Sequence, residues 1–121
     1  MEAQKFNHVN PKILQSIAHH SHNRSLPAEL VRIFKEDVRQ LLQRFDQALE
    51  ERDVSKLQFL AHRIKGSALN VGAKSMAEIC ATIERSLGDK HDWNKINQHI
   101  KRLNALMEQT SQEFSDLLHG D

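Results

Sequence analysis

The chain has 121 residues, of which 39% are hydrophobic and 27% are charged, a composition typical of a soluble globular domain. Lys and Arg total 17 against 16 Asp and Glu, so the formal net charge of +1 argues against nucleic-acid binding, which usually requires a clear basic excess. No apolar run approaches the roughly 18 residues of a membrane span, and no signal peptide opens the chain, so we expect a cytoplasmic protein without membrane contact.

Five segments carry apolar residues at spacings of three and four, which predicts helices and no strand. The predicted helices cover residues 11–20, 27–52, 54–71, 74–87 and 92–118. Their ends carry suitable capping residues: Asn10, Ser25 and Asp53 at N-termini, Pro11 and Pro27 in first turns, and Gly72 and Gly88 at C-termini. Short connections favour antiparallel neighbours. We therefore predict an all-α protein: an antiparallel up-down four-helix bundle with a short extra N-terminal helix.

This bundle is predicted to be a single domain over residues 1–121, with its helical core over about residues 10–118. The short first helix is expected to bury Ile13, Leu14 and Ile17. The chain's single cysteine, Cys80, lies on the apolar stripe of the fourth helix, so we interpret it as a buried structural thiol.

The third predicted helix has a core stripe of Leu57, Leu60, Ala61, Ile64, Ala68 and Val71. Its opposite face should be polar, yet Phe59 and Leu69 also point away from the core, on either side of His62. Gly66 lies one turn beyond His62 on the same face, and Lys65 lies three residues from His62 toward the side. An interior glycine costs a helix roughly 1 kcal/mol relative to alanine, but here it removes bulk beside the imidazole. This face therefore indicates either a docking surface for another molecule or ordinary exposed apolar residues.

The run His62-Arg63-Ile64-Lys65-Gly66-Ser67, with Gly72 ending the helix, resembles the H-x-x-K-G-[small]-x-x-x-x-G signature of histidine-containing phosphotransfer (HPt) domains. The resemblance implies that His62 is the phosphoacceptor and that Lys65 offsets the charge of the phosphoryl group. It also implies that Gly66 admits a partner protein. Phe59 and Leu69, with Arg63 and Ser67 beside the motif, are then expected to belong to the partner-binding face.

Glu84, on the next helix, falls where many HPt domains carry glutamine or another polar group that reaches the histidine. Whether this glutamate contacts the phosphoryl group or holds the imidazole stays open at this point. If it accepts the ring N–H of His62, it fixes the tautomer and leaves the other ring nitrogen free to attack phosphorus.

The resemblance predicts a phosphorelay intermediate, not an autonomous kinase. A phosphoaspartate on a response-regulator receiver domain, such as that of a hybrid sensor kinase, would donate to His62, and a second receiver would then accept the group. The chain has no glycine-rich nucleotide loop and no carboxylate cluster for magnesium, so we expect no cofactor here and the magnesium ion on the receiver. We also expect a monomer and no metal site.

Two other interpretations stay open from the sequence. A haem or metal protein would need ligands that face inward from different helices, whereas His62 faces outward and the cluster His19, His20 and His22 lacks a carboxylate or cysteine. A helical interaction module without phosphotransfer would explain Phe59 and Leu69. It would leave His62, Lys65 and Gly66 without a joint purpose.

Overall fold

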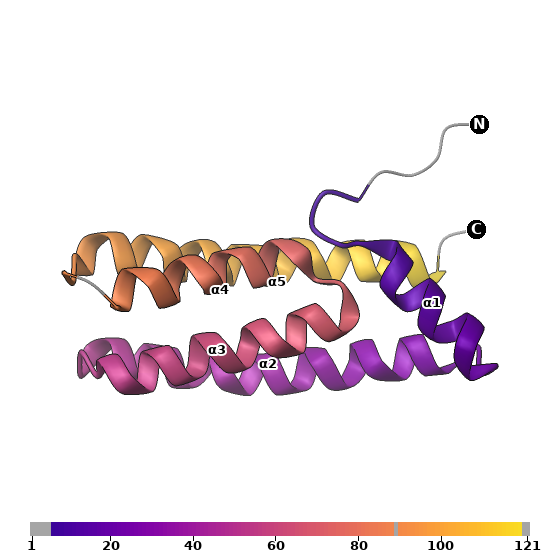
Figure 1. Cartoon of the computed structure of the whole chain (residues 1–121), viewed down its shortest axis with the longest axis horizontal. Coiled ribbons are helices and arrows are strands. Elements are labelled where there is room, and N and C mark those ends of the chain that lie inside the picture. Colours follow the sequence, from indigo (N-terminus) through magenta and orange to yellow (C-terminus); the bar gives the residue numbers. More distant parts are fainter. Residues whose placement is uncertain (1–5, 89, 120–121) are drawn as a thin grey trace.

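The computed structural model describes residues 6–88 and 90–119. Its helices are α1 (Pro11–Ser21), α2 (Leu26–Glu50), α3 (Val54–Val71), α4 (Lys74–Leu87) and α5 (Trp93–His119). Helices α2 to α5 run up and down beside one another, and α1 lies across one end of them (Figure 1). α3 packs against both α2 and α4, and α5 closes the bundle against α4 and α2. The predicted all-α four-helix bundle with a short extra N-terminal helix is confirmed.

Most of the predicted helix caps form as expected. The Asn10 side chain accepts the N–H of Lys12 at 3.1 Å, and the Asp53 side chain accepts the N–H of Lys56 at 3.1 Å. Each of these bonds pairs a backbone donor that the first helical turn leaves free. Gly88 follows the last residue of α4, as predicted.

Ser25 does not cap α2 as the sequence predicted. The helix begins at Leu26, and the backbone of Ser25 is already in the right-handed helical region, with φ −86° and ψ −13°. An N-cap needs an extended backbone for its side chain to fold back onto the first turn. The Ser25 hydroxyl instead donates to Asn23 Oδ1 at 2.7 Å, and the same oxygen accepts the Ser25 N–H at 3.0 Å.

Gly72 ends α3 in a place that only glycine fits. Its φ of +82° lies in the left-handed region, where a side chain causes strain. A Cβ atom at this position would also lie 2.6 Å from the carbonyl oxygen of Asn10. The close approach lets the Asn10 N–H donate to the Gly72 carbonyl at 2.8 Å, which ties the start of α1 to the turn between α3 and α4.

The core lies between the four longer helices. Its largest fully buried side chains come from all of them and include Phe45, Phe114, Leu57, Leu60, Ile64, Met76, Ile83, Leu87, Ile96 and Leu103. Cys80 is fully buried among them, and burial, with the nearby Glu84 carboxylate, raises the pKa of its thiol to about 12. A thiol that stays protonated at neutral pH is a weak nucleophile, so Cys80 is structural, as predicted.

α1 is less buried than the sequence predicted. Of its three expected core residues, Leu14 is buried, whereas Ile13 and Ile17 stay half-exposed. The reason is that α1 lies across the end of the bundle and contacts α2 and α3 on one side.

Thr110 of α5 is fully buried, and its hydroxyl has no hydrogen-bond partner among the described residues. An unpaired buried polar group costs about 1–3 kcal/mol. We therefore expect Thr110→Val, which keeps the shape and removes the hydroxyl, to raise the free energy of unfolding by about 1 kcal/mol in a urea titration. A loss of stability would show that the hydroxyl is paired in solution.

Candidate functional site

His62 stands on the outer face of α3, near the middle of the helix. The six predicted core residues of α3 are all buried, which turns the opposite side of the helix to solvent. The His62 side chain is 74% exposed. The sequence periodicity had placed His62 outward, and the structure confirms this orientation.

Glu84 of α4 contacts both His62 and Lys65 of α3. Its Oε2 lies 3.3 Å from His62 Nδ1, and its Oε1 lies 2.7 Å from Lys65 Nζ. His62 and Lys65 are three residues apart and therefore neighbours on the surface of α3. The antiparallel packing of α4 on α3 brings Glu84 beside both.

The Glu84 contact determines which ring nitrogen of His62 is available. When the Nδ1–H donates to the carboxylate, Nε2 carries the lone pair. Partial burial raises the pKa of the Glu84 carboxyl, but the Lys65 ammonium, aided by the hydrogen bond from His62, outweighs it and leaves this pKa below its usual value. The carboxyl is therefore ionised at neutral pH and can hold the His62 tautomer.

The ion pair between Lys65 and Glu84 was not anticipated from the sequence. Both side chains are about one-quarter exposed, at 27% and 26%. The helical spacing placed Lys65 beside His62, which is correct, but it gave no register between α3 and α4. The sequence suggested Glu84 as a partner for His62 or for its phosphoryl group, and not for Lys65.

Two large apolar side chains flank His62, as predicted. Phe59 is 57% exposed and Leu69 is 58% exposed. Gly66 lies between them on the helix, and a Cβ atom there would meet nothing within 4 Å. The fold therefore does not require this glycine, and the surface beside the imidazole is open.

The remaining predicted partner-binding residues lie at the edges of this face. Arg63 is exposed and, with Phe59, lines a shallow hollow shared with Asp37, Gln40, Leu41 and Arg44 of α2. Ser67 is half-buried. The hollow extends the face onto α2, which the sequence did not predict.

Ile33 of α2 is a further large apolar residue that is exposed, at 48%, and the sequence did not predict its exposure. Its position off the apolar stripe of the helix was a signal for it.

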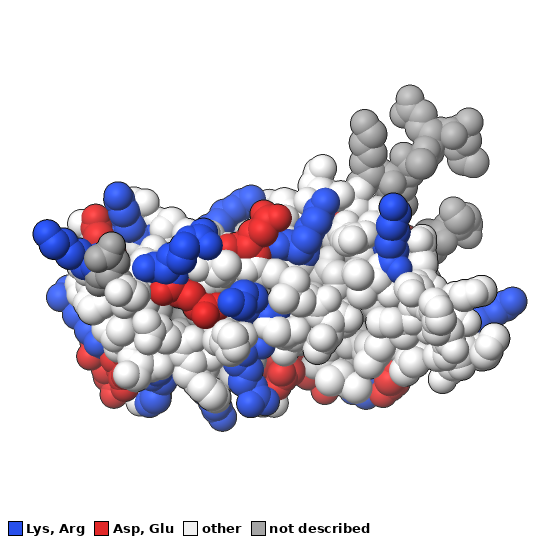
Figure 2. Space-filling model, viewed as in Figure 1, with Lys and Arg blue, Asp and Glu red and all other residues white. Residues whose placement is uncertain are grey.

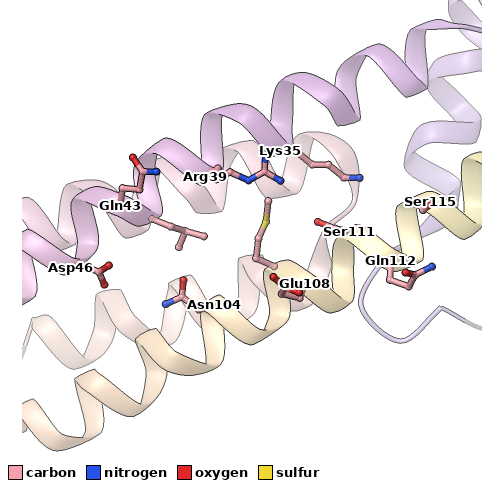
Figure 3. Close-up of a pocket in the computed structure, with 11 residues that line it drawn as sticks. Lys35, Arg39, Gln43, Asp46, Asn104, Glu108, Ser111, Gln112 and Ser115 are labelled. Carbon is pink, nitrogen blue, oxygen red and sulfur yellow. The ribbon is translucent and has the colours of Figure 1, made fainter.

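A large groove among the described residues lies elsewhere, between α2 and α5 (Figure 3). It has a volume of about 660 Å³ and is lined largely by polar side chains. The lining comprises Lys35, Arg39, Leu42, Gln43, Asp46, Asn104, Met107, Glu108, Ser111, Gln112 and Ser115, and includes none of the predicted site residues. His62 therefore lies on an open surface, which suits a macromolecular partner better than an enclosed small molecule.

Residues 6–88 and 90–119 contain neither a metal-binding cluster nor a helix that could span a membrane. No group of three or more His, Cys, Asp or Glu side chains is placed to hold a metal ion, and His19, His20 and His22 form no such group. No described helix combines the length and apolar character needed to cross a membrane.

The model of the Hpt domain family matches residues 29–113, which include His62, Lys65 and Glu84. The chain belongs to the HPt family. HPt proteins are phosphotransfer carriers and not kinases, so this HPt chain is a histidine phosphotransfer protein. No curated protein sequence matches the chain.

Two solved structures share the HPt fold of this chain. Histidine-containing phosphotransfer protein B (HptB) from Pseudomonas aeruginosa PAO1 aligns with a TM-score of 0.83 and 22% identity, over 95% of this chain and 97% of HptB. A rice protein described as a putative histidine-containing phosphotransfer protein aligns with a TM-score of 0.81 and 18% identity, over 93% of this chain and 81% of its own. At these identities the likeness shows the fold.

Proposed function

We propose that His62 of this HPt protein accepts a phosphoryl group from the phosphoaspartate of a receiver domain and passes it to the aspartate of a second receiver. The observation that supports this most is that Nδ1 of His62 contacts Glu84 while the rest of the ring is exposed. Gly66, beside the ring, leaves open space for a partner. A nucleophile held this way presents Nε2 to a docking protein.

The transfer needs no separate base on this chain. The Nε2 lone pair attacks phosphorus and forms the N–P bond, while the P–O bond breaks and its electron pair stays on the receiver's aspartate carboxylate. The Nδ1 proton remains hydrogen-bonded to Glu84. In the return step a carboxylate of the second receiver attacks phosphorus, and the electron pair of the N–P bond returns to Nε2.

In this proposal, opposite charges on the receiver and on this chain favour docking. The receiver holds the magnesium ion near its acidic residues, and the HPt chain contributes no cofactor of its own. Lys and Arg side chains are spread over the face that shows α3 and α4, with some acidic side chains among them (Figure 2). Arg63 belongs to α3 and adds positive charge close to His62. Such charges favour association with an acidic partner.

The cellular setting follows from the same proposal. A cytoplasmic monomer would reach receiver domains by diffusion, and a receiver of a hybrid sensor kinase is the expected donor. The chain would not phosphorylate itself from ATP, because its sequence has no glycine-rich nucleotide loop.

The proposal is tested by mixing the protein with a receiver domain that carries a labelled phosphoryl group, and then adding a second, unphosphorylated receiver. We expect the label to move onto this chain and then onto the second receiver. With ATP alone we expect no label on the chain. Receiver binding without movement of the label would favour an interaction module instead.

We expect Phe59→Ala and Leu69→Ala each to weaken receiver binding by roughly 1–2 kcal/mol, because both side chains are exposed apolar anchors beside His62. The free energy of unfolding should change little, since neither residue belongs to the core. Calorimetric titration with the receiver and urea unfolding on the same variants measure both effects. Leu42→Ala truncates an apolar side chain in the α2–α5 groove, away from His62, and should leave receiver affinity unchanged. Unfolding losses of about 2–5 kcal/mol in the Phe59 or Leu69 variant would instead mark that residue as core.

A further inference from the structure

Glu84 carries a negative charge at the point where the phosphoryl group would arrive. We infer that this carboxylate acts as a positioning residue that keeps phosphorylated His62 high in free energy, so that the chain favours donating its phosphoryl group over storing it. The inference rests on the proposed function and concerns the equilibrium between phosphorylated and unphosphorylated His62. It follows from two features of the contacts around Glu84.

The first feature is that Glu84 binds the cation that would otherwise neutralise the phosphoryl group. Lys65 Nζ lies 2.7 Å from Glu84 Oε1, and both side chains are about three-quarters buried. A phosphoryl group adds roughly 1.5 to 2 negative charges. Lys65 must therefore either leave Glu84 or divide its hydrogen bonds between the carboxylate and the phosphoryl oxygens. Either arrangement stabilises the phosphorylated state less than a free lysine would.

The second feature is repulsion between like charges. Glu84 Oε2 lies 3.3 Å from His62 Nδ1, so phosphorylation of Nε2 on the same ring places two anionic groups on opposite sides of one imidazole. Partly buried charges are screened less than fully exposed ones. The two anionic groups would lie on the order of 8 Å apart across the ring, where a unit charge facing about 1.5 to 2 charges changes an equilibrium constant roughly fivefold in a water-like dielectric.

Glu84→Gln tests the inference because the amide can still accept the Nδ1–H but carries no charge and holds Lys65 less tightly. Wild type and variant are each brought to equilibrium with the same phosphorylated receiver, and the ratio of phosphorylated protein to phosphorylated receiver is measured. We expect the ratio to rise at least about fivefold in the variant. The half-life of the phosphorylated protein, after the receiver is removed, should lengthen as well. Thermal melting checks that the variant is folded.

Glu78→Gln is the matched control. Glu78 is an exposed glutamate on the same helix, and its substitution changes the net charge equally without a contact to His62. An unchanged or lower ratio in Glu84→Gln would overturn the inference, and so would an equal rise in Glu78→Gln. If wild type accepts no phosphoryl group at all, the proposed function itself fails. The two failures are therefore distinguishable.

Discussion

His62→Gln is expected to abolish phosphoryl transfer from a phosphorylated receiver while the protein stays folded. Glutamine has no nucleophilic ring nitrogen, and the position is exposed, so the free energy of unfolding should change by no more than about 0.5 kcal/mol. Transfer of labelled phosphate measures the first effect, and urea unfolding measures the second.

The chain has eight histidines, so a matched control is needed. His19 is also exposed on a helix, α1, and His19→Gln should transfer at the wild-type rate. Wild-type transfer by His62→Gln would mean that another side chain is the acceptor. Loss of transfer in both variants would indicate a general effect on the protein and not the loss of a specific nucleophile.

Substitutions at Gly66 are expected to lower the rate of phosphoryl transfer without lowering the free energy of unfolding. A Cβ atom at Gly66 meets nothing within 4 Å, so Gly66→Ala should raise the free energy of unfolding by about 1 kcal/mol. Gly66→Leu should fold as well, but its side chain would occupy the space in which the receiver approaches His62. A displacement of about 1 Å from the reactive geometry can slow a reaction on the order of a hundredfold.

Both variants are measured by chemical unfolding and by the rate of transfer from the same receiver. The expected pattern is unchanged or increased stability together with a transfer rate that falls steeply for the leucine variant. A wild-type rate in Gly66→Leu would show that no part of the receiver comes close to this glycine. A large loss of stability in Gly66→Ala would show that the glycine serves the fold.

The phase of α3 could be read from the sequence because one apolar stripe fixes which way every other residue of that helix points. Leu57, Ala61, Ile64 and Ala68 are all fully buried, and so His62 had to face outward. The same periodicity correctly exposed Phe59 and Leu69. Positions within one helix are related by fixed geometry, which is why this part of the site was predictable.

Contacts between helices were harder to predict, because they depend on register and crossing angle. The ion pair of Lys65 with Glu84 requires α4 to pack at one particular register on α3, and periodicity within either helix does not specify it. The half-exposure of Ile13 and Ile17 has a similar cause, since an apolar stripe does not reveal how much of it a neighbour covers. The cap predicted at Ser25 does not form because the Ser25 backbone is already in the helical region, which the residue type alone does not reveal.

Locating the phosphoryl group on the protein shows which atom accepts it. After transfer from a phosphorylated receiver, protein with 15N-labelled histidine is examined by NMR for the nitrogen that is bonded to phosphorus. We expect a phosphoramidate on Nε2 of His62, labile in acid and stable in base, with Nδ1 still protonated toward Glu84. Phosphorus bonded to a nitrogen of any other histidine, or an acid-stable phosphate on oxygen, would contradict it.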